Sequence, residues 1–127
     1  MPGPVPADLV RVIDGDTIEV RAHIWPGQYV ETRVRVSGID TPERRGAECE
    51  AERALAEEAT RFTQAWLEDA AIGLEAVDLG SFAGRVIARV RRADGAELGE
   101  ALLAAGLAAP YGAAAPWCPA IAPEPSD

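Results

Sequence analysis

The stretch that decides the fold is residues 9–36, LVRVIDGDTIEVRAHIWPGQYVETRVRV, in which apolar and polar side chains alternate. An alternation with a period of two is typical of strands that bury one face. Asp14-Gly15-Asp16 interrupts the pattern, and Asp-Gly is a preferred sequence for tight hairpin turns. We therefore expect a three-stranded meander whose first turn is tight.

Beyond this stretch the spacing of apolar residues changes. Residues 50–69 carry apolar side chains at the spacing of an amphipathic helix. Residues 98–105 predict a short second helix that ends at Gly106. The expected strands cover residues 9–13, 17–24, 30–37, 74–79 and 85–91. This order predicts a mainly β fold with helices, a five-stranded OB barrel (β-β-β-α-β-β-α), although an α+β sheet of other connectivity fits the same string.

A length of 127 residues with 48% apolar content predicts a single domain. We expect an N-terminal extension over residues 1–8, the domain over residues 9–111 and an irregular tail, rich in Pro and Ala, over residues 112–127. The longest uncharged stretch, residues 101–123, is broken by glycines and prolines, so we expect no membrane span. The first residues lack the regions of a signal peptide, although a mature chain that has lost its signal would look similar. We expect a monomer.

Charge limits the kinds of partner. Twelve arginines and no lysine stand against 21 acidic residues, and the net charge of −9 disfavours nucleic-acid binding through bulk charge. The charge is also segregated, because residues 48–69 hold seven acids and two arginines while residues 85–94 hold four arginines and one acid. His23 is the only histidine, which excludes an imidazole acid–base pair and a histidine metal cluster. Any phosphate chemistry must be local and must use arginines and carboxylates.

Cys49 and Cys118 are the only cysteines, and they lie too far apart for a zinc knuckle or a CxxC pair. One disulfide and two reduced thiols both remain open. A disulfide would close a loop of about 70 residues, contribute about 4 kcal/mol and imply an oxidising compartment. The location is therefore expected to be extracytoplasmic if the bridge forms and a signal has been removed, and cytoplasmic otherwise.

Two acidic motifs are candidates for metal or acid–base chemistry. Asp14-Gly15-Asp16 places two carboxylates beside a glycine, where a hard cation such as calcium finds oxygen ligands. Residues 40–43, DTPE, offer two more carboxylates. Each motif alone favours a structural interpretation, because the first is a preferred turn and the second resembles a helix capping box.

The combination of these motifs favours catalysis. Metal-assisted hydrolysis of a phosphodiester needs a cation site, a carboxylate that activates water, and cationic donors for the charge that develops on the phosphoryl oxygens. Asp16 and Asp40 are the candidates for the cation site, and Glu43 is the candidate that activates water. Arg35 and Arg85 are the candidate cationic donors. Other arginines alternate on the same strands, so spacing alone does not select Arg35 and Arg85.

Three motifs, residues 12–17 (VIDGDT), residues 35–43 (RVSGIDTPE) and Gly84-Arg85, resemble in order and spacing the thermonuclease family, also called staphylococcal nuclease-like. Residues 98–111 are similar to the second helix of that family and the aromatic residue beyond it. The resemblance implies an OB-fold nuclease that hydrolyses DNA and RNA, single strands preferred, with calcium. Cleavage of the bond to the 5′ oxygen would leave 3′-phosphate ends.

The resemblance also implies a role for each matching position. The calcium ligands would be Asp16, Asp40 and the backbone carbonyl of Thr41, with Asp14 a neighbouring acid that does not ligate. Glu43 would activate water, Arg35 and Arg85 would clamp the phosphoryl group, and Tyr111 would contact substrate. Cys49 and Cys118 are placed as in bacterial members with a bridge between such cysteines.

The chain departs from the family before Gly84. Where the family often has Asp-Lys-Tyr, this chain has Ser81-Phe82-Ala83. Phe82 is a candidate to stack a substrate base, and equally a candidate to anchor the turn. The departure supports a rival hypothesis, an OB-fold module that binds nucleic acid without cutting it, and the net charge of −9 supports a purely structural or protein-binding barrel.

Overall fold

The computed structural model describes residues 4–78, 85–113 and 117–118. The strands are β1 (Val5–Asp14), β2 (Thr17–Trp25), β3 (Gln28–Val36), β4 (Ile39–Asp40), β5 (Ile72–Asp78), β6 (Arg85–Arg92) and β7 (Ala109–Pro110), and the helices are α1 (Glu50–Leu67) and α2 (Leu98–Ala104). Five strands close into a barrel in the order β1-β2-β3-β6-β5, and β4 pairs with β7 in a separate two-stranded sheet. The expected five-stranded OB barrel is confirmed.

The barrel follows from the alternation of side chains. β1, β2 and β3 form the expected antiparallel meander, and β3 then pairs in parallel with β6, from Arg33 opposite Arg85 to Val36 opposite Ala88. Inward residues of these strands make the core, while the arginines of β3 face outward because successive side chains point to opposite faces. Fully buried core residues include Ile18, Val20, Val34, Val36, Ala88 and Val90.

The first strand begins at Val5 rather than at residue 9. Val5 and Ala7 are buried and pair with β5, so much of the segment expected to be an N-terminal extension belongs to the barrel. β4 and β7, of two residues each, are too short to leave a periodic pattern in the sequence. In the described part of the tail, residues 112–113 and 117–118, there is no helix or strand.

α1 packs against the barrel through small side chains. Of the side chains predicted to form its apolar stripe, Ala51 is exposed, Ala59 is buried, and three pack partly buried against the core: Leu55, Phe62 and Trp66. The most buried positions of the helix carry small side chains, among them Ala56, Ala59 and Thr63. The reason is the close approach of the first turn: a Cβ on Gly15 would lie 2.8 Å from Ala59 Cβ, and Thr63 Oγ1 donates to the Gly15 carbonyl at 2.8 Å. Gly15 is therefore required by contact with the helix.

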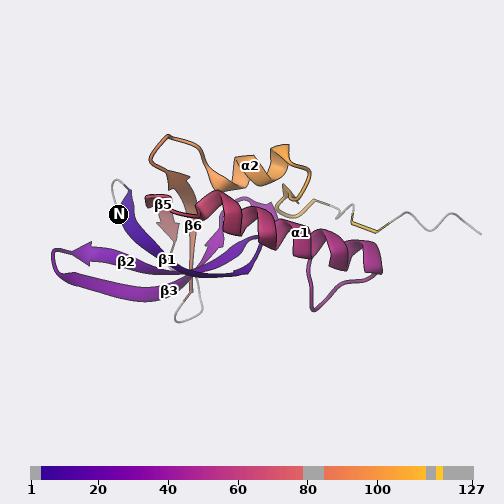
Figure 1. Ribbon diagram of the computed structural model, residues 1–127, viewed down its shortest axis with the longest axis horizontal. Coiled ribbons are helices and arrows are strands. Elements are labelled where there is room, and N and C mark those ends of the chain that lie inside the picture. Colours follow the sequence, from indigo (N-terminus) through magenta and orange to yellow (C-terminus); the bar gives the residue numbers. More distant parts are fainter. Residues whose placement is uncertain (1–3, 79–84, 114–116, 119–127) are drawn as a thin grey trace, which may run out of the picture.

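Figure 1 shows α1 running along one side of the barrel, with the β2–β3 hairpin extending from one end and the C-terminal segment lying at the other. The loop from β4 to α1 lies at the same end as the C-terminal segment. Neither helix in the described part of the chain has the length and apolar character needed to cross a bilayer.

Candidate active site

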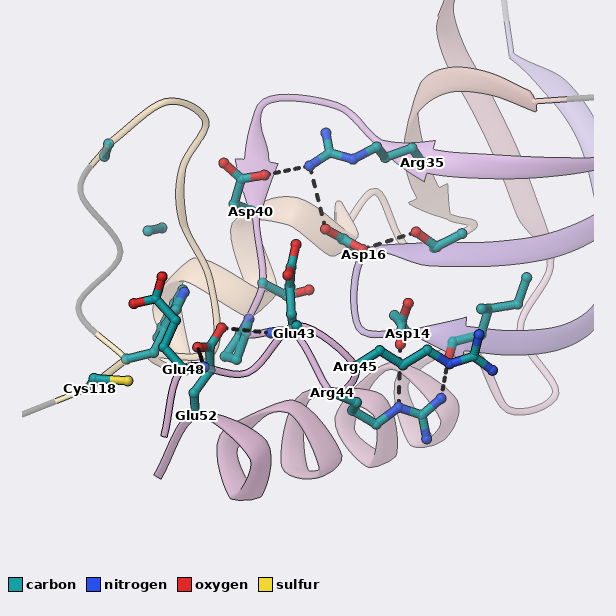
Figure 2. Close-up of a pocket in the computed structure, with 18 of the residues that line it drawn as sticks. Asp14, Asp16, Arg35, Asp40, Glu43, Arg44, Arg45, Glu48, Glu52 and Cys118 are labelled. Carbon is teal, nitrogen blue, oxygen red and sulfur yellow. Dashed lines mark hydrogen bonds and ion pairs between the residues drawn. The ribbon is translucent and has the colours of Figure 1, made fainter. Parts of the chain in front are cut away.

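A pocket of about 850 Å³ opens where the first hairpin meets β3 and the loop after β4 (Figure 2). The predicted residues that line it are Asp14, Asp16, Arg35, Asp40, Thr41 and Glu43. It is also lined by Arg11, Arg33, Arg44, Arg45, Glu48, Glu52, Trp117 and Cys118, among others. The fold thus gathers most of the predicted site residues, from segments far apart in the sequence, around one opening.

Arg35 joins the two aspartates at one side of the pocket. Its Nη2 contacts Asp40 Oδ1 and lies 3.6 Å from Asp16 Oδ2. Thr17 Oγ1 donates to the other oxygen of Asp16 at 3.0 Å, which orients that carboxylate. Because both aspartates contact one nitrogen atom, their carboxylates converge on a single point, as Figure 2 shows.

Arg35 is held on its other side by Tyr111. The centroid of the Tyr111 ring lies 5.4 Å from Arg35 Cζ, within the range of a cation–π contact. The Tyr111 backbone N–H donates to the Gly38 carbonyl at 3.0 Å, which fixes the start of the C-terminal segment beside the pocket. Tyr111 remains 68% exposed, so it stays open to a ligand that approaches Arg35.

Glu43 extends from the loop between β4 and α1. Its backbone N–H donates to the Glu52 carboxylate at 3.0 Å. Its own carboxylate lies against Gly46, so closely that a side chain at position 46 would collide with Glu43 Oε2. Arg44, from the same loop, forms an ion pair with Asp14, with Nε 3.3 Å from Asp14 Oδ1. Asp14 therefore lies in the pocket near Asp16 but is paired with an arginine.

Arg85 is not among the residues that line the pocket. It is exposed at the start of β6, and its register partner is Arg33, which does line the pocket. Paired residues of neighbouring strands project from the same face, so Arg85 lies on the outer face of the barrel beside Arg33. Its phosphate-binding role stays a prediction. Phe82 and its neighbours Ser81 and Ala83 lie outside the described residues.

Residues 33–120 match the family of staphylococcal nuclease homologues. The chain belongs to this family. Membership suggests a nuclease that acts on nucleic acid, in a family that is typically calcium-dependent. A comparison with curated proteins found no match.

The family match includes Arg35, Asp40 and Glu43 but begins after Asp16. It is the tertiary structure that brings Asp16 from the first hairpin to Asp40. For this member of the staphylococcal nuclease family, the first hairpin is therefore an integral part of the pocket, although the match leaves it out.

The pocket's oxygen donors fit a hard cation in kind. Calcium takes six to eight oxygen ligands, and Asp16 and Asp40 present carboxylates with the buried Thr41 beside them. Within the described residues no group of three or more His, Cys, Asp or Glu side chains is close enough to hold a metal. The two aspartates and the Thr41 carbonyl would hold the ion, with water completing its ligands.

A disulfide joins Cys49 and Cys118 across 69 positions of sequence. Cys49 is also the N-cap of α1, where its Sγ accepts from the Glu52 N–H at 3.3 Å. Trp117 is 6% exposed and lines the pocket beside the bridge. The bridge therefore fastens the C-terminal segment to the start of α1, which follows the loop that carries Glu43.

Glu52 is a site residue that the sequence analysis missed. Its carboxylate is buried, with 7% of the residue exposed, and accepts from two backbone N–H groups, those of Glu43 at 3.0 Å and Glu48 at 2.9 Å. One carboxylate thus ties both ends of the loop that carries Glu43. One sequence signal could have found it. Glu52 lies four residues before Ala56, on the face of α1 whose other side chains are buried and mostly small.

Replacing Glu52 with glutamine is expected to loosen this loop, because a glutamine amide has one acceptor oxygen for two N–H donors. We expect cleavage to slow by about tenfold or more, since small displacements of catalytic groups carry large rate penalties. Amide hydrogen exchange at positions 43 and 48 should accelerate in the same variant. Glu57→Gln, on the exposed side of α1, is the matched control. Unchanged exchange at both amides would contradict the positioning role.

Proposed function

We propose that this protein is a calcium-dependent nuclease that hydrolyses phosphodiester bonds in DNA and RNA. The observation that supports it most is the convergence of Asp16 and Asp40 on Arg35 Nη2 in the pocket that Glu43 lines. Metal-ligating carboxylates, a general base and a phosphate donor are the three parts that this chemistry needs.

Arg35 has donors left for a phosphate. A guanidinium carries five N–H groups, and both aspartate contacts use Nη2. Nη1 and Nε have no partner among the described residues. The N–H groups of these two nitrogens are available to donate to phosphoryl oxygens. Arg35 can therefore remain fixed by Asp40 while it donates to a scissile phosphate.

In the proposed reaction Glu43 accepts a proton from a water molecule whose oxygen attacks phosphorus. The bond from phosphorus to the 5′ oxygen breaks, and the departing oxygen takes a proton from solvent water, which leaves a 3′-phosphate and a 5′-hydroxyl. Arg35 stabilises the charge that develops on the phosphoryl oxygens, with Arg85 as the proposed second donor. Calcium, when held by Asp16, Asp40 and the Thr41 carbonyl, would supply Lewis acidity for this reaction.

The charge of the pocket explains why a cation is needed for binding. Among the described residues, five arginines and six carboxylates line it, an excess of one negative charge when all are ionised. A polyanion gains little from such a pocket, whereas a divalent cation turns the excess positive. The pocket is thus suited to phosphate only in its cation-bound form, in a chain whose net charge is −9.

We expect a fluorescent single-stranded oligonucleotide to be cut with calcium present and to stay intact with a chelator. Mass spectrometry of the products should show 3′-phosphate and 5′-hydroxyl ends. Tight binding of the oligonucleotide without calcium-dependent products would instead favour the non-cleaving OB-fold module. If the protein neither binds nor cuts the oligonucleotide, the hypothesis of a structural or protein-binding barrel would be favoured.

A further inference from the structure

We propose that the outer face of β2 and β3 binds a single-stranded segment of nucleic acid that continues from the pocket toward the β2–β3 hairpin. The proposal rests on the proposed function and names a second contact region for the same substrate. It places a phosphate contact at Arg33 and a base platform at Tyr29. Neither residue was a candidate in the sequence.

The outer face consists of rows of side chains that cross the strands. Thr17 and Arg35 form the row at the pocket, Glu19 and Arg33 the next, Arg21 and Glu31 the third, and His23 and Tyr29 the last. Arg11 and Arg85 extend the second row on its two sides. The face therefore runs without interruption from the pocket to the hairpin, which Figure 1 shows extending away from the rest of the molecule.

Arg33 carries a positive charge that no side chain of the described residues neutralises. The acids of this face are all engaged: Glu19 with Arg11 at 3.1 Å, Glu31 with Arg21 at 3.2 Å and Asp8 with His23 at 2.7 Å. Arg33 has neither an ion pair nor a side-chain hydrogen bond among those residues, and its neighbour Arg85 has none either. Two adjacent free guanidiniums beside the pocket complement a phosphate backbone.

Tyr29 supplies an aromatic surface at the far end of the face. Arg21 Cζ lies 5.0 Å from the centroid of its ring, and the His23 ring lies 6.1 Å away, tilted by 58°. These contacts orient the ring, yet Tyr29 remains 55% exposed. An oriented, accessible aromatic ring is a platform on which a nucleic-acid base stacks irrespective of sequence.

The length of the face fits a short single strand. Arg35 and Tyr29 are six residues apart on β3, which corresponds to about 20 Å at the rise of a strand. OB folds bind oligonucleotides on the face of their second and third strands, with sites of about 4 nucleotides or more. Charge complementarity and continuity with the pocket both favour nucleic acid as the occupant.

The test measures binding of labelled oligo(dT) of 2 and 12 nucleotides by fluorescence anisotropy with calcium present, in a Glu43→Gln background in which cleavage is expected to be slow. Tyr29→Ala should weaken binding of the 12-mer by about 10-fold, the effect of one lost stacking contact. Val30→Ala is the matched control, because Val30 is 45% exposed on the opposite face of the same strand. The dinucleotide should bind both variants as it binds the parent protein.

Arg33→Gln should also weaken binding of the 12-mer and lower the slope of log K against log salt concentration by about 0.7, the effect of one lost phosphate contact on a single strand. Arg61→Gln, an equal change of charge on the exposed side of α1, should leave both quantities unchanged.

The two proposals fail separately. If the parent protein cuts DNA with calcium while both test variants bind the 12-mer normally, the binding face is wrong and the nuclease stands. If the variants weaken binding but no calcium-dependent products form, the binding face stands and the nuclease does not. Loss of 12-mer binding in the two controls to the same extent as in the test variants would also overturn the binding face.

Discussion

Replacing Glu43 with glutamine is expected to lower the calcium-dependent cleavage rate by about 100-fold or more, the usual effect of removing a general base. Glutamine has the size of glutamate but cannot accept a proton from water at neutral pH. The Glu43 backbone N–H to Glu52 bond should survive, since the substitution changes only the side chain. The measurement is kcat for a labelled oligonucleotide at saturating calcium.

Two further readouts separate a catalytic role from a structural one. Calcium affinity measured by calorimetry should change little, because the proposed ligands are Asp16, Asp40 and Thr41. Thermal stability should also be retained, since Glu43 is exposed. Glu58→Gln, an equal charge change on the exposed side of α1, controls for net charge. Cleavage by Glu43→Gln at the parent rate would rule out this residue as the base.

Removing the disulfide with Cys49→Ser and Cys118→Ser together is expected to lower the free energy of unfolding by about 2–4 kcal/mol. The bridge spans 69 positions, and a loop of that size restricts the unfolded chain strongly. A domain has about 5–15 kcal/mol in total, so the melting temperature should fall by roughly 10 °C or more. Serine at position 49 preserves an N-cap acceptor for α1, so the loss reports the bridge itself.

Reducing agent provides the control for the disulfide prediction. It should destabilise the parent protein by a similar amount and leave the double serine variant unaffected. Thiol titration of the native protein should find no free thiol. Two titratable thiols in the native protein would contradict the bridge, and with it the expectation that the chain folds in an oxidising compartment.

Much of the candidate site could be predicted because its residues lie in short motifs with local constraints. Asp40 ends the short strand β4, Thr41 and Glu43 come after it, and Asp16 lies in a turn between two strands. An outward position on β3 could be assigned to Arg35 from alternation alone. What alternation could not provide was a choice among the arginines, since Arg33 and Arg35 satisfy the same period of two.

The residues that were missed act through contacts between segments. In the sequence, Glu52 does not differ in kind from the other acidic residues of this helix. In the structure its carboxylate is buried against the loop that carries Glu43. Gly15 appears as a turn glycine, although contact with Ala59 is what excludes a side chain there. The position of Glu52 on the buried stripe of α1 is the one local signal. The contacts of both residues depend on what another segment places opposite them.

The sequence by itself determined the main strands and helices, their succession along the chain and the identity of the acidic motifs, since periodicity and turn chemistry are properties of neighbouring residues. Only the tertiary structure decided that Asp16 and Asp40 converge on one nitrogen of Arg35, and that Arg33 rather than Arg85 lines the pocket. Barrel closure and strand register set these distances, and both are fixed by the packing of the whole core. The same packing joins Cys49 to Cys118, a pairing that the sequence left open.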